Sequence, residues 1–147
     1  MLKSFAGAAL AAVLITMPVT VAAQEEQSIW EGVYTQEQAA RGEKVNSGVC
    51  AKCHGLRGDG ANEPDQPGGP AIARYSFLRK WDGTSLAALF TYVKTEMPPD
   101  NPASRSDQDY IDVIAHMLAL SGAPTGETEL PTDIETLDYI FIEQKPE

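Results

Sequence analysis

Apolar residues recur at helical spacing in three segments of the chain. The first segment begins at Thr35-Gln36-Glu37-Gln38, which has the form of a capping box. In such a box the Thr35 hydroxyl accepts from a backbone amide of the first turn and the Gln38 side chain reaches back to the cap. We therefore expect a helix from about Gln36 to Ser47.

The second and third segments are marked by apolar stripes and by their ends. The second stripe follows Asp82-Gly83-Thr84 and consists of Leu86, Leu89, Phe90 and Val93. Met97-Pro98-Pro99 should end this helix near Glu96, because proline has no amide hydrogen to donate. The third helix should begin at the capping box Ser106 to Asp109, stop at Gly122-Ala123-Pro124 and bury Tyr110, Val113, Ile114, Met117 and Leu118.

Two further segments lack a long helical pattern. Residues 55–70 are rich in glycine and proline, and we predict a loop there. Residues 123–147 are acidic but also contain leucine, isoleucine and phenylalanine, which a disordered tail normally lacks. We expect this tail to fold back over the helices, with a short strand at Tyr139 to Ile142. Docking on a partner and a loose tail are the alternatives.

The first 23 residues have the organisation of a secretory signal peptide. Lys3 provides the positive charge, Phe5 to Met17 is apolar, and Val21-Ala22-Ala23 supplies small residues for cleavage. The apolar run is shorter than the ~20 residues that a membrane-spanning helix needs. We therefore expect residues 1–23 to be removed and the mature protein to be periplasmic, with an uncleaved anchor as the alternative.

The acidic composition restricts the partners of the chain. The formal net charge is −10, which argues against nucleic acid because a basic surface supplies most of that affinity. The charge fits either a solvated exterior or electrostatic steering toward a basic protein partner.

The sequence Cys50-Ala51-Lys52-Cys53-His54 is a C-x-x-C-H motif, the attachment motif of a c-type haem. On a helical turn, residues i, i+3 and i+4 share one face, so both thiols and the imidazole can reach one flat macrocycle. Cys50 and Cys53 would form thioether bonds to the haem, and His54 would bind its iron. A thiol redox pair or half of a zinc site is the alternative, but the chain has only 2 Cys and 2 His.

Around this motif, the chain resembles a class I monohaem cytochrome c. The matching features occur in the expected order: Gly42 before Cys50, the motif itself, Gly69-Pro70, Met97-Pro98, and a last helix containing Ile114 to Leu118. The resemblance implies an all-α fold with three main helices and loops wrapped around one covalently bound haem c. It divides the mature chain into a cytochrome domain, residues 24–122, and a C-terminal extension, residues 123–147, packing on the domain.

A narrower resemblance concerns the partner. Residues 29–35, residues 38–42, Trp81-Asp82-Gly83 and residues 96–100 are similar to cytochromes that are fused to, or accompany, quinoprotein (PQQ) alcohol dehydrogenases. This resemblance implies a periplasmic dehydrogenase as one redox partner, and an oxidase or another cytochrome as the other.

The resemblance also implies that His54 is the proximal iron ligand and Met97 the distal one. Elimination among the residues leads in the same direction. Met1 and Met17 leave with the signal peptide, and Met117 lies on the apolar stripe of the last helix, where methionine usually belongs to the core. His116, Met117 and an open coordination site remain as alternatives to Met97.

Three residues are carried over as supports of the haem. Pro70 resembles the proline whose carbonyl accepts from the proximal histidine, although a plain loop proline is the alternative. Trp81 and Tyr75 are candidates to donate hydrogen bonds to the haem propionates, and packing alone would equally explain them.

Two positions depart from the family pattern. Asn46 and His116 stand where related cytochromes commonly have aromatic residues, near the crossing of the first and last helices. We hypothesise that a polar contact between Asn46 and His116 replaces the aromatic pair; otherwise ligation of iron by His116 gains support.

The leading function is outer-sphere electron transfer, since no other residues form a catalytic constellation. We therefore expect an electron carrier rather than an enzyme. The alternative functions are a peroxidase-like haem enzyme or small-ligand binder with a labile Met97, and a permanent cytochrome subunit of a dehydrogenase complex.

Overall fold

The computed structural model describes residues 24–60 and 68–146, so the expected signal peptide and part of the expected loop lie outside the described residues. The longer helices are α1 (Gln36–Val45), α3 (Arg74–Trp81), α4 (Leu86–Glu96) and α5 (Asp107–Leu120). Shorter elements are β1 (Gln27–Ser28), η1 (Ile29–Glu31), η2 (Asn46–Cys50), α2 (Ala51–His54), β2 (Thr84–Ser85), α6 (Ile134–Leu137) and β3 (Ile140–Ile142).

The three predicted helices are present as α1, α4 and α5. The capping box that begins α5 is formed: the Asp109 amide donates to Ser106 Oγ at 3.1 Å, and Asp109 Oδ2 accepts from the Ser106 amide. The helical path that begins at α1 continues beyond the predicted end at Ser47, through the π-helical turn η2 and into α2. This path carries the C-x-x-C-H motif.

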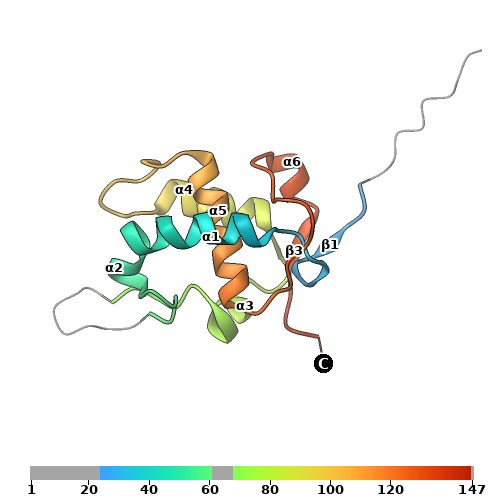
Figure 1. The fold of residues 1–147 in the computed structure, drawn as a ribbon, viewed down its shortest axis with the longest axis horizontal. Helices are drawn as coiled ribbons and strands as arrows, with labels where there is room; N and C mark the ends of the chain where they lie inside the picture. Colours follow the sequence, from blue (N-terminus) through green and yellow to red (C-terminus); the bar gives the residue numbers. More distant parts are fainter. Residues whose placement is uncertain (1–23, 61–67, 147) are drawn as a thin grey trace, which may run out of the picture.

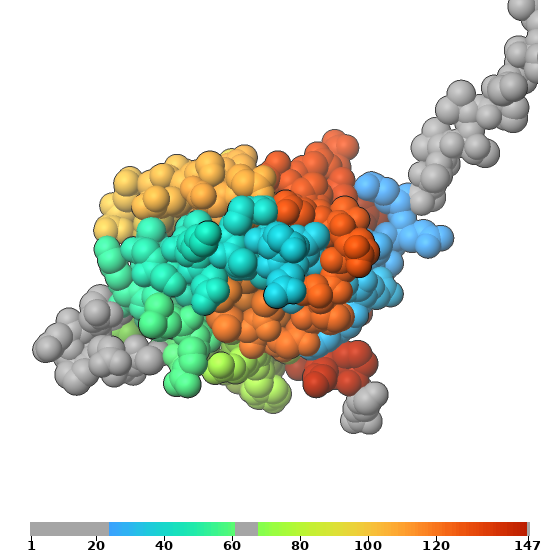
Figure 2. All heavy atoms as spheres, viewed as in Figure 1, coloured from blue at the N-terminus to red at the C-terminus, as the bar shows by residue number. Residues whose placement is uncertain are grey.

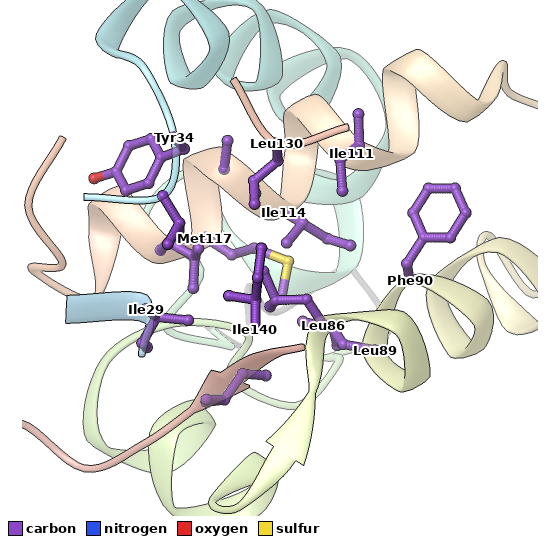
Figure 3. Packing of buried hydrophobic residues seen from close by; sticks show 14 of the residues in the cluster. Ile29, Tyr34, Leu86, Leu89, Phe90, Ile111, Ile114, Met117, Leu130 and Ile140 are labelled. Atoms are coloured by element: carbon purple, nitrogen blue, oxygen red, sulfur yellow. The ribbon is translucent and has the colours of Figure 1, made fainter. Parts of the chain in front are cut away.

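Helices α1 and α5 cross in close contact, and Gly42 makes the contact possible (Figure 1). A Cβ atom on Gly42 would overlap the backbone carbonyl of Asp112. Residues 110–118 of α5 are all buried, so this helix forms the centre of the domain. Figure 3 shows Ile111, Ile114 and Met117 of α5 among the core residues of other segments.

Burial of a carboxylate at this crossing is compensated by hydrogen bonds. Asp112 is 3% exposed and accepts from Arg41 Nε at 2.8 Å and from Gln108 Nε2 at 2.7 Å. Arg41 also pairs with Glu129 in the tail. Since a buried charge without partners is costly, this network accounts for an aspartate in the middle of the core helix.

Helix α3 was not predicted from the sequence. Its cap residue, Ala73, has no side chain that accepts a hydrogen bond, so the usual local signal is missing. The Arg74 amide instead donates to Ser121 Oγ, at the end of α5, at 2.8 Å. The start of α3 therefore depends on a residue distant in the sequence.

The domain is mostly helical but also contains a small three-stranded sheet with the order β1-β3-β2. Strand β3 is the short strand predicted at Tyr139 to Ile142. It pairs parallel with β1 (Gln27 opposite Ile140) and antiparallel with β2 (Thr84 opposite Ile142). In Figure 2 the C-terminal segment, in red, accordingly lies against the N-terminal segment, in blue.

The tail after α5 folds back over the helices. Leu130, Leu137, Ile140 and Ile142 are each at most 4% exposed. Gln38 makes its hydrogen bonds to this tail: its side chain binds both backbone groups of Leu130. The predicted capping box at α1 is thus only half correct, since the Gln38 amide donates to Thr35 Oγ1 but the Gln38 side chain does not reach back.

The helices in residues 24–60 and 68–146 are all too short or too polar to span a lipid bilayer.

Candidate functional site

The C-x-x-C-H motif lies where η2 passes into α2. Cys50 is the last residue of η2, and Cys53 and His54 end α2. All three residues line one cavity, as their predicted common face requires. The cysteines are not joined to each other and are both partly exposed. Burial raises the pKa of the Cys50 thiol, and the positive charge of Arg105 partly opposes this effect.

The loop after the motif holds the His54 imidazole. His54 Nδ1 lies 2.7 Å from the carbonyl oxygen of Pro70; because a carbonyl only accepts, Nδ1 carries the proton and donates. Gly69 packs against the ring, where a Cβ would come within 2.8 Å of Cε1 and Nδ1. The Gly69 amide also donates to the Cys53 carbonyl. This arrangement leaves Nε2 as the nitrogen able to bind a metal.

The cavity is mostly apolar. About 920 Å³ of space free of protein atoms lies between its walls, a figure that includes open solvent. The apolar walls come from the first helical path, from α4 and α5, and from two loops: Val45, Val49, Ile72, Leu89, Val93, Pro98, Pro99, Tyr110 and Val113.

Met97 lies in the wall of this cavity, directly after α4. Its amide donates to the Val93 carbonyl at 3.0 Å, and its carbonyl accepts from the Tyr110 hydroxyl at 2.9 Å. Met117 also lines the cavity, from α5, and is 3% exposed. The structure therefore brings both methionines of the described chain to the same cavity as His54.

His116 does not line the cavity, so its position gives no support to the alternative that it binds iron. Burial lowers the pKa of His116, and the negative charge of Glu43 opposes that shift. The side chain is 8% exposed and belongs to the core of the helix crossing.

The predicted hydrogen bond between Asn46 and His116 is not formed. Asn46 Nδ2 donates instead to the Leu56 carbonyl at 3.3 Å. Asn46 Oδ1 and His116 Nε2 are both buried without a hydrogen-bond partner in the part of the chain that the structure describes. The hypothesis that one polar pair replaces the aromatic pair is therefore wrong as stated: Asn46 binds the loop after α2 instead.

The two propionate candidates differ in position. Trp81 lines the cavity and packs edge-on against Tyr92, with ring centroids 5.4 Å apart. Its indole N–H has no hydrogen-bond partner within residues 24–60 and 68–146. Tyr75 is 69% exposed, lies outside the cavity wall and stacks under Arg79. Tyr75 is therefore not brought to the site, because it projects from the solvent side of α3.

Several cavity residues were missed from the sequence. Lys80 and Arg105 place positive charge in the wall, and Lys80 lies over the rings of Trp81 and Tyr92. Tyr110 was predicted only as a core residue. The helical stripe of α5 placed Tyr110 on an inward face, but no sequence signal connected its hydroxyl to Met97.

The chemistry of these residues fits a covalently bound haem. The wall offers the two thiols of the C-x-x-C-H motif, one imidazole with its tautomer fixed, and mostly apolar surroundings. The glycine at position 69 leaves room for the histidine ring in that orientation. When bound, haem supplies a one-electron Fe(II)/Fe(III) couple.

A helical domain with this motif and cavity defines a c-type cytochrome. Residues 37–117 match the family model described as cytochrome c oxidase, cbb3-type, subunit III, which is more than half of the chain; the chain therefore belongs to this family. No curated protein and no solved structure gave a match.

Family membership confirms the central predictions from the sequence. The fold is the class I cytochrome c fold, and the cofactor is covalently bound haem c, with Cys50, Cys53 and His54 fitting its attachment motif. The protein is a haem-based electron-transfer cytochrome.

Proposed function

We propose that the protein carries single electrons at a haem whose iron is bound by His54 and Met97. The observation that carries this proposal is that both residues line one apolar cavity next to Cys50 and Cys53. Ligation by histidine and methionine raises the reduction potential, and burial from water tunes it further. With His54 and Met97 as its ligands, the iron would exchange electrons without binding a substrate.

The ligand assignment is tested by Met97→Ala, with Met117→Leu as the matched control. Loss of the near-infrared sulfur-to-iron band of the ferric protein is expected for Met97→Ala alone. Loss of the band in Met117→Leu alone would assign Met117 instead. Rapid binding of carbon monoxide to the reduced wild-type protein would favour the small-ligand binder or peroxidase.

We further propose that residues 1–23 direct the chain to the periplasm and are then removed. The supporting pattern is the charged, apolar and small-residue order of those residues. Mass spectrometry of the periplasmic protein should give a mature chain that begins after Ala23 and carries one haem.

The electron donor, in this proposal, is a periplasmic dehydrogenase of the quinoprotein alcohol dehydrogenase class, and the acceptor is an oxidase or another cytochrome. Support comes from the sequence segments similar to cytochromes that accompany such enzymes. One of them, residues 96–100, contributes Met97, Pro98 and Pro99 to the cavity wall. Reduction of the purified cytochrome by a quinoprotein dehydrogenase, followed optically, tests the donor; co-purification of the two in stoichiometric amounts would indicate a permanent subunit.

Trp81 is proposed to donate its free indole hydrogen to a haem propionate. The alternative is that Trp81 only packs against Tyr92. Trp81→Phe keeps most of that packing, so a changed pH dependence of the reduction potential would support the hydrogen bond.

A further inference from the structure

Three interactions close the segment that leads from Met97 into α5. Lys94 Nζ and Asp107 Oδ1 form an ion pair at 2.7 Å. The Ala103 amide donates to the Lys94 carbonyl at 3.0 Å. The Tyr110 hydroxyl donates to the Met97 carbonyl at 2.9 Å. The segment is therefore fixed at both of its ends.

The Tyr110 bond differs from the ion pair in its surroundings. The side chains of Lys94 and Asp107 are 37% and 48% exposed, so water and salt weaken their attraction. Tyr110 is 4% exposed and lines the cavity beside Met97. Water competes less with this partly buried hydrogen bond than with the exposed ion pair, and losing it leaves a partly buried carbonyl without its partner.

We propose that Tyr110 is a positioning residue for Met97: its hydroxyl, by holding the Met97 carbonyl, keeps the methionine side chain in the cavity and resists its exchange for external ligands. This inference rests on the proposed role of Met97 as an iron ligand. The hydroxyl acts through the backbone carbonyl of Met97, so its effect is on the balance between bound and released Met97.

The consequence is a shift in population. An external ligand binds only to molecules in which Met97 has been released, and its apparent affinity is proportional to that fraction. Removing one hydrogen bond of ordinary net strength should increase the released fraction roughly 2- to 10-fold. The apparent affinity for the external ligand should increase by the same factor.

The test is a titration of the ferric holoprotein with imidazole, comparing wild type, Tyr110→Phe and Tyr34→Phe. Tyr34 is a matched control, since its hydroxyl also donates to a backbone carbonyl, that of Ala123, at 2.6 Å, and Tyr34 does not line the cavity. Both variants keep the aromatic ring and should lose similar resistance to denaturant. Only Tyr110→Phe should bind imidazole roughly 2- to 10-fold more tightly.

Two results overturn the inference, and they are distinguishable from failure of the ligand assignment. Equal imidazole affinity in Tyr110→Phe and wild type would show that the hydroxyl does not hold Met97 in place. An equal increase of imidazole affinity in Tyr110→Phe and Tyr34→Phe would show that the affinity follows the general loss of stability. If Met97→Ala kept the sulfur-to-iron band, the assignment of Met97 would fail first, and the position of Tyr110 would have no bearing on the iron.

Discussion

The side chain of Gln38 is hydrogen-bonded to both backbone groups of Leu130. Its Nε2 donates to the Leu130 carbonyl at 2.9 Å, and its Oε1 accepts from the Leu130 amide at 2.8 Å. Gln38 is fully buried, so one side chain on α1 satisfies the backbone of the tail as a neighbouring strand would.

Replacing Gln38 by alanine should therefore lower the free energy of unfolding by about 2–5 kcal/mol, because two buried backbone groups lose their partners at once. Urea unfolding followed by circular dichroism measures this loss. Gln36→Ala, at an exposed position of the same helix, is the control and should change stability by less than about 0.5 kcal/mol. Equal stability of the two variants would contradict the assigned role of Gln38.

Gly42→Ala should also destabilise the domain. The new methyl group would overlap the Asp112 carbonyl, which belongs to the backbone of α5 and moves only if the two helices separate. We expect a net loss of about 1–3 kcal/mol, despite the helix-favouring effect of alanine. The melting temperature measures it, and Gly48→Ala, whose methyl group would meet open space, is the control.

Gly69→Ala should interfere with haem attachment. Its Cβ would lie 2.8 Å from two ring atoms of His54 and should turn the imidazole away from the Pro70 carbonyl. Loss of the hydrogen-bond partner of a metal-binding histidine commonly lowers metal affinity about 10- to 100-fold. The haem content per polypeptide, measured by pyridine haemochrome and protein absorbance, should fall. Gly48→Ala again serves as the control, and wild-type haem content in Gly69→Ala would contradict the prediction.

His116 should make stability depend on pH. Burial lowers its pKa in the folded state below the ordinary value of 6.5, so the unfolded chain binds the proton more readily. The stability contributed by the neutral ring is complete above about pH 6.5 and is lost as pH falls through the folded pKa. His116→Phe should remove this part of the pH dependence, measured as the difference in unfolding free energy between about pH 7.5 and pH 5.

An unchanged pH dependence in His116→Phe would show that the ring does not titrate differently in the two states. Glu43→Gln provides a second comparison. Because the negative charge of Glu43 raises the pKa of His116, its removal should extend the loss of stability to lower pH.

The parts of the fold that the sequence predicted correctly are those with local signals. The stripes of α4 and α5, the stop at Met97-Pro98 and the capping box at Ser106 each depend on residues within a few positions of one another. The haem motif is local for the same reason, since its three functional residues occupy one helical turn.

The remaining features depend on contacts between distant segments. The first amide of helix α3 donates to the hydroxyl of Ser121, and the Gln38 side chain binds the tail rather than the backbone of the cap residue Thr35. Tyr75 was a candidate donor to a haem propionate because a buried phenol usually finds a hydrogen-bond partner, but Tyr75 is exposed to solvent on α3. No local sequence pattern predicts these contacts and orientations, because each depends on which distant segment of the chain packs against the residue.

Strand β3 joins the two ends of the described chain, since it pairs with β1 near the beginning and with β2 before α4. Gln27 and Ile140 are far apart in the sequence, so β1 gains its neighbouring strand only when a long loop closes. Leu137 and Ile142, on either side of this pairing, belong to the core. Formation of the sheet is therefore a non-local step of folding, and a polypeptide cut before Ile140 would lack the strand that joins β1 to β2.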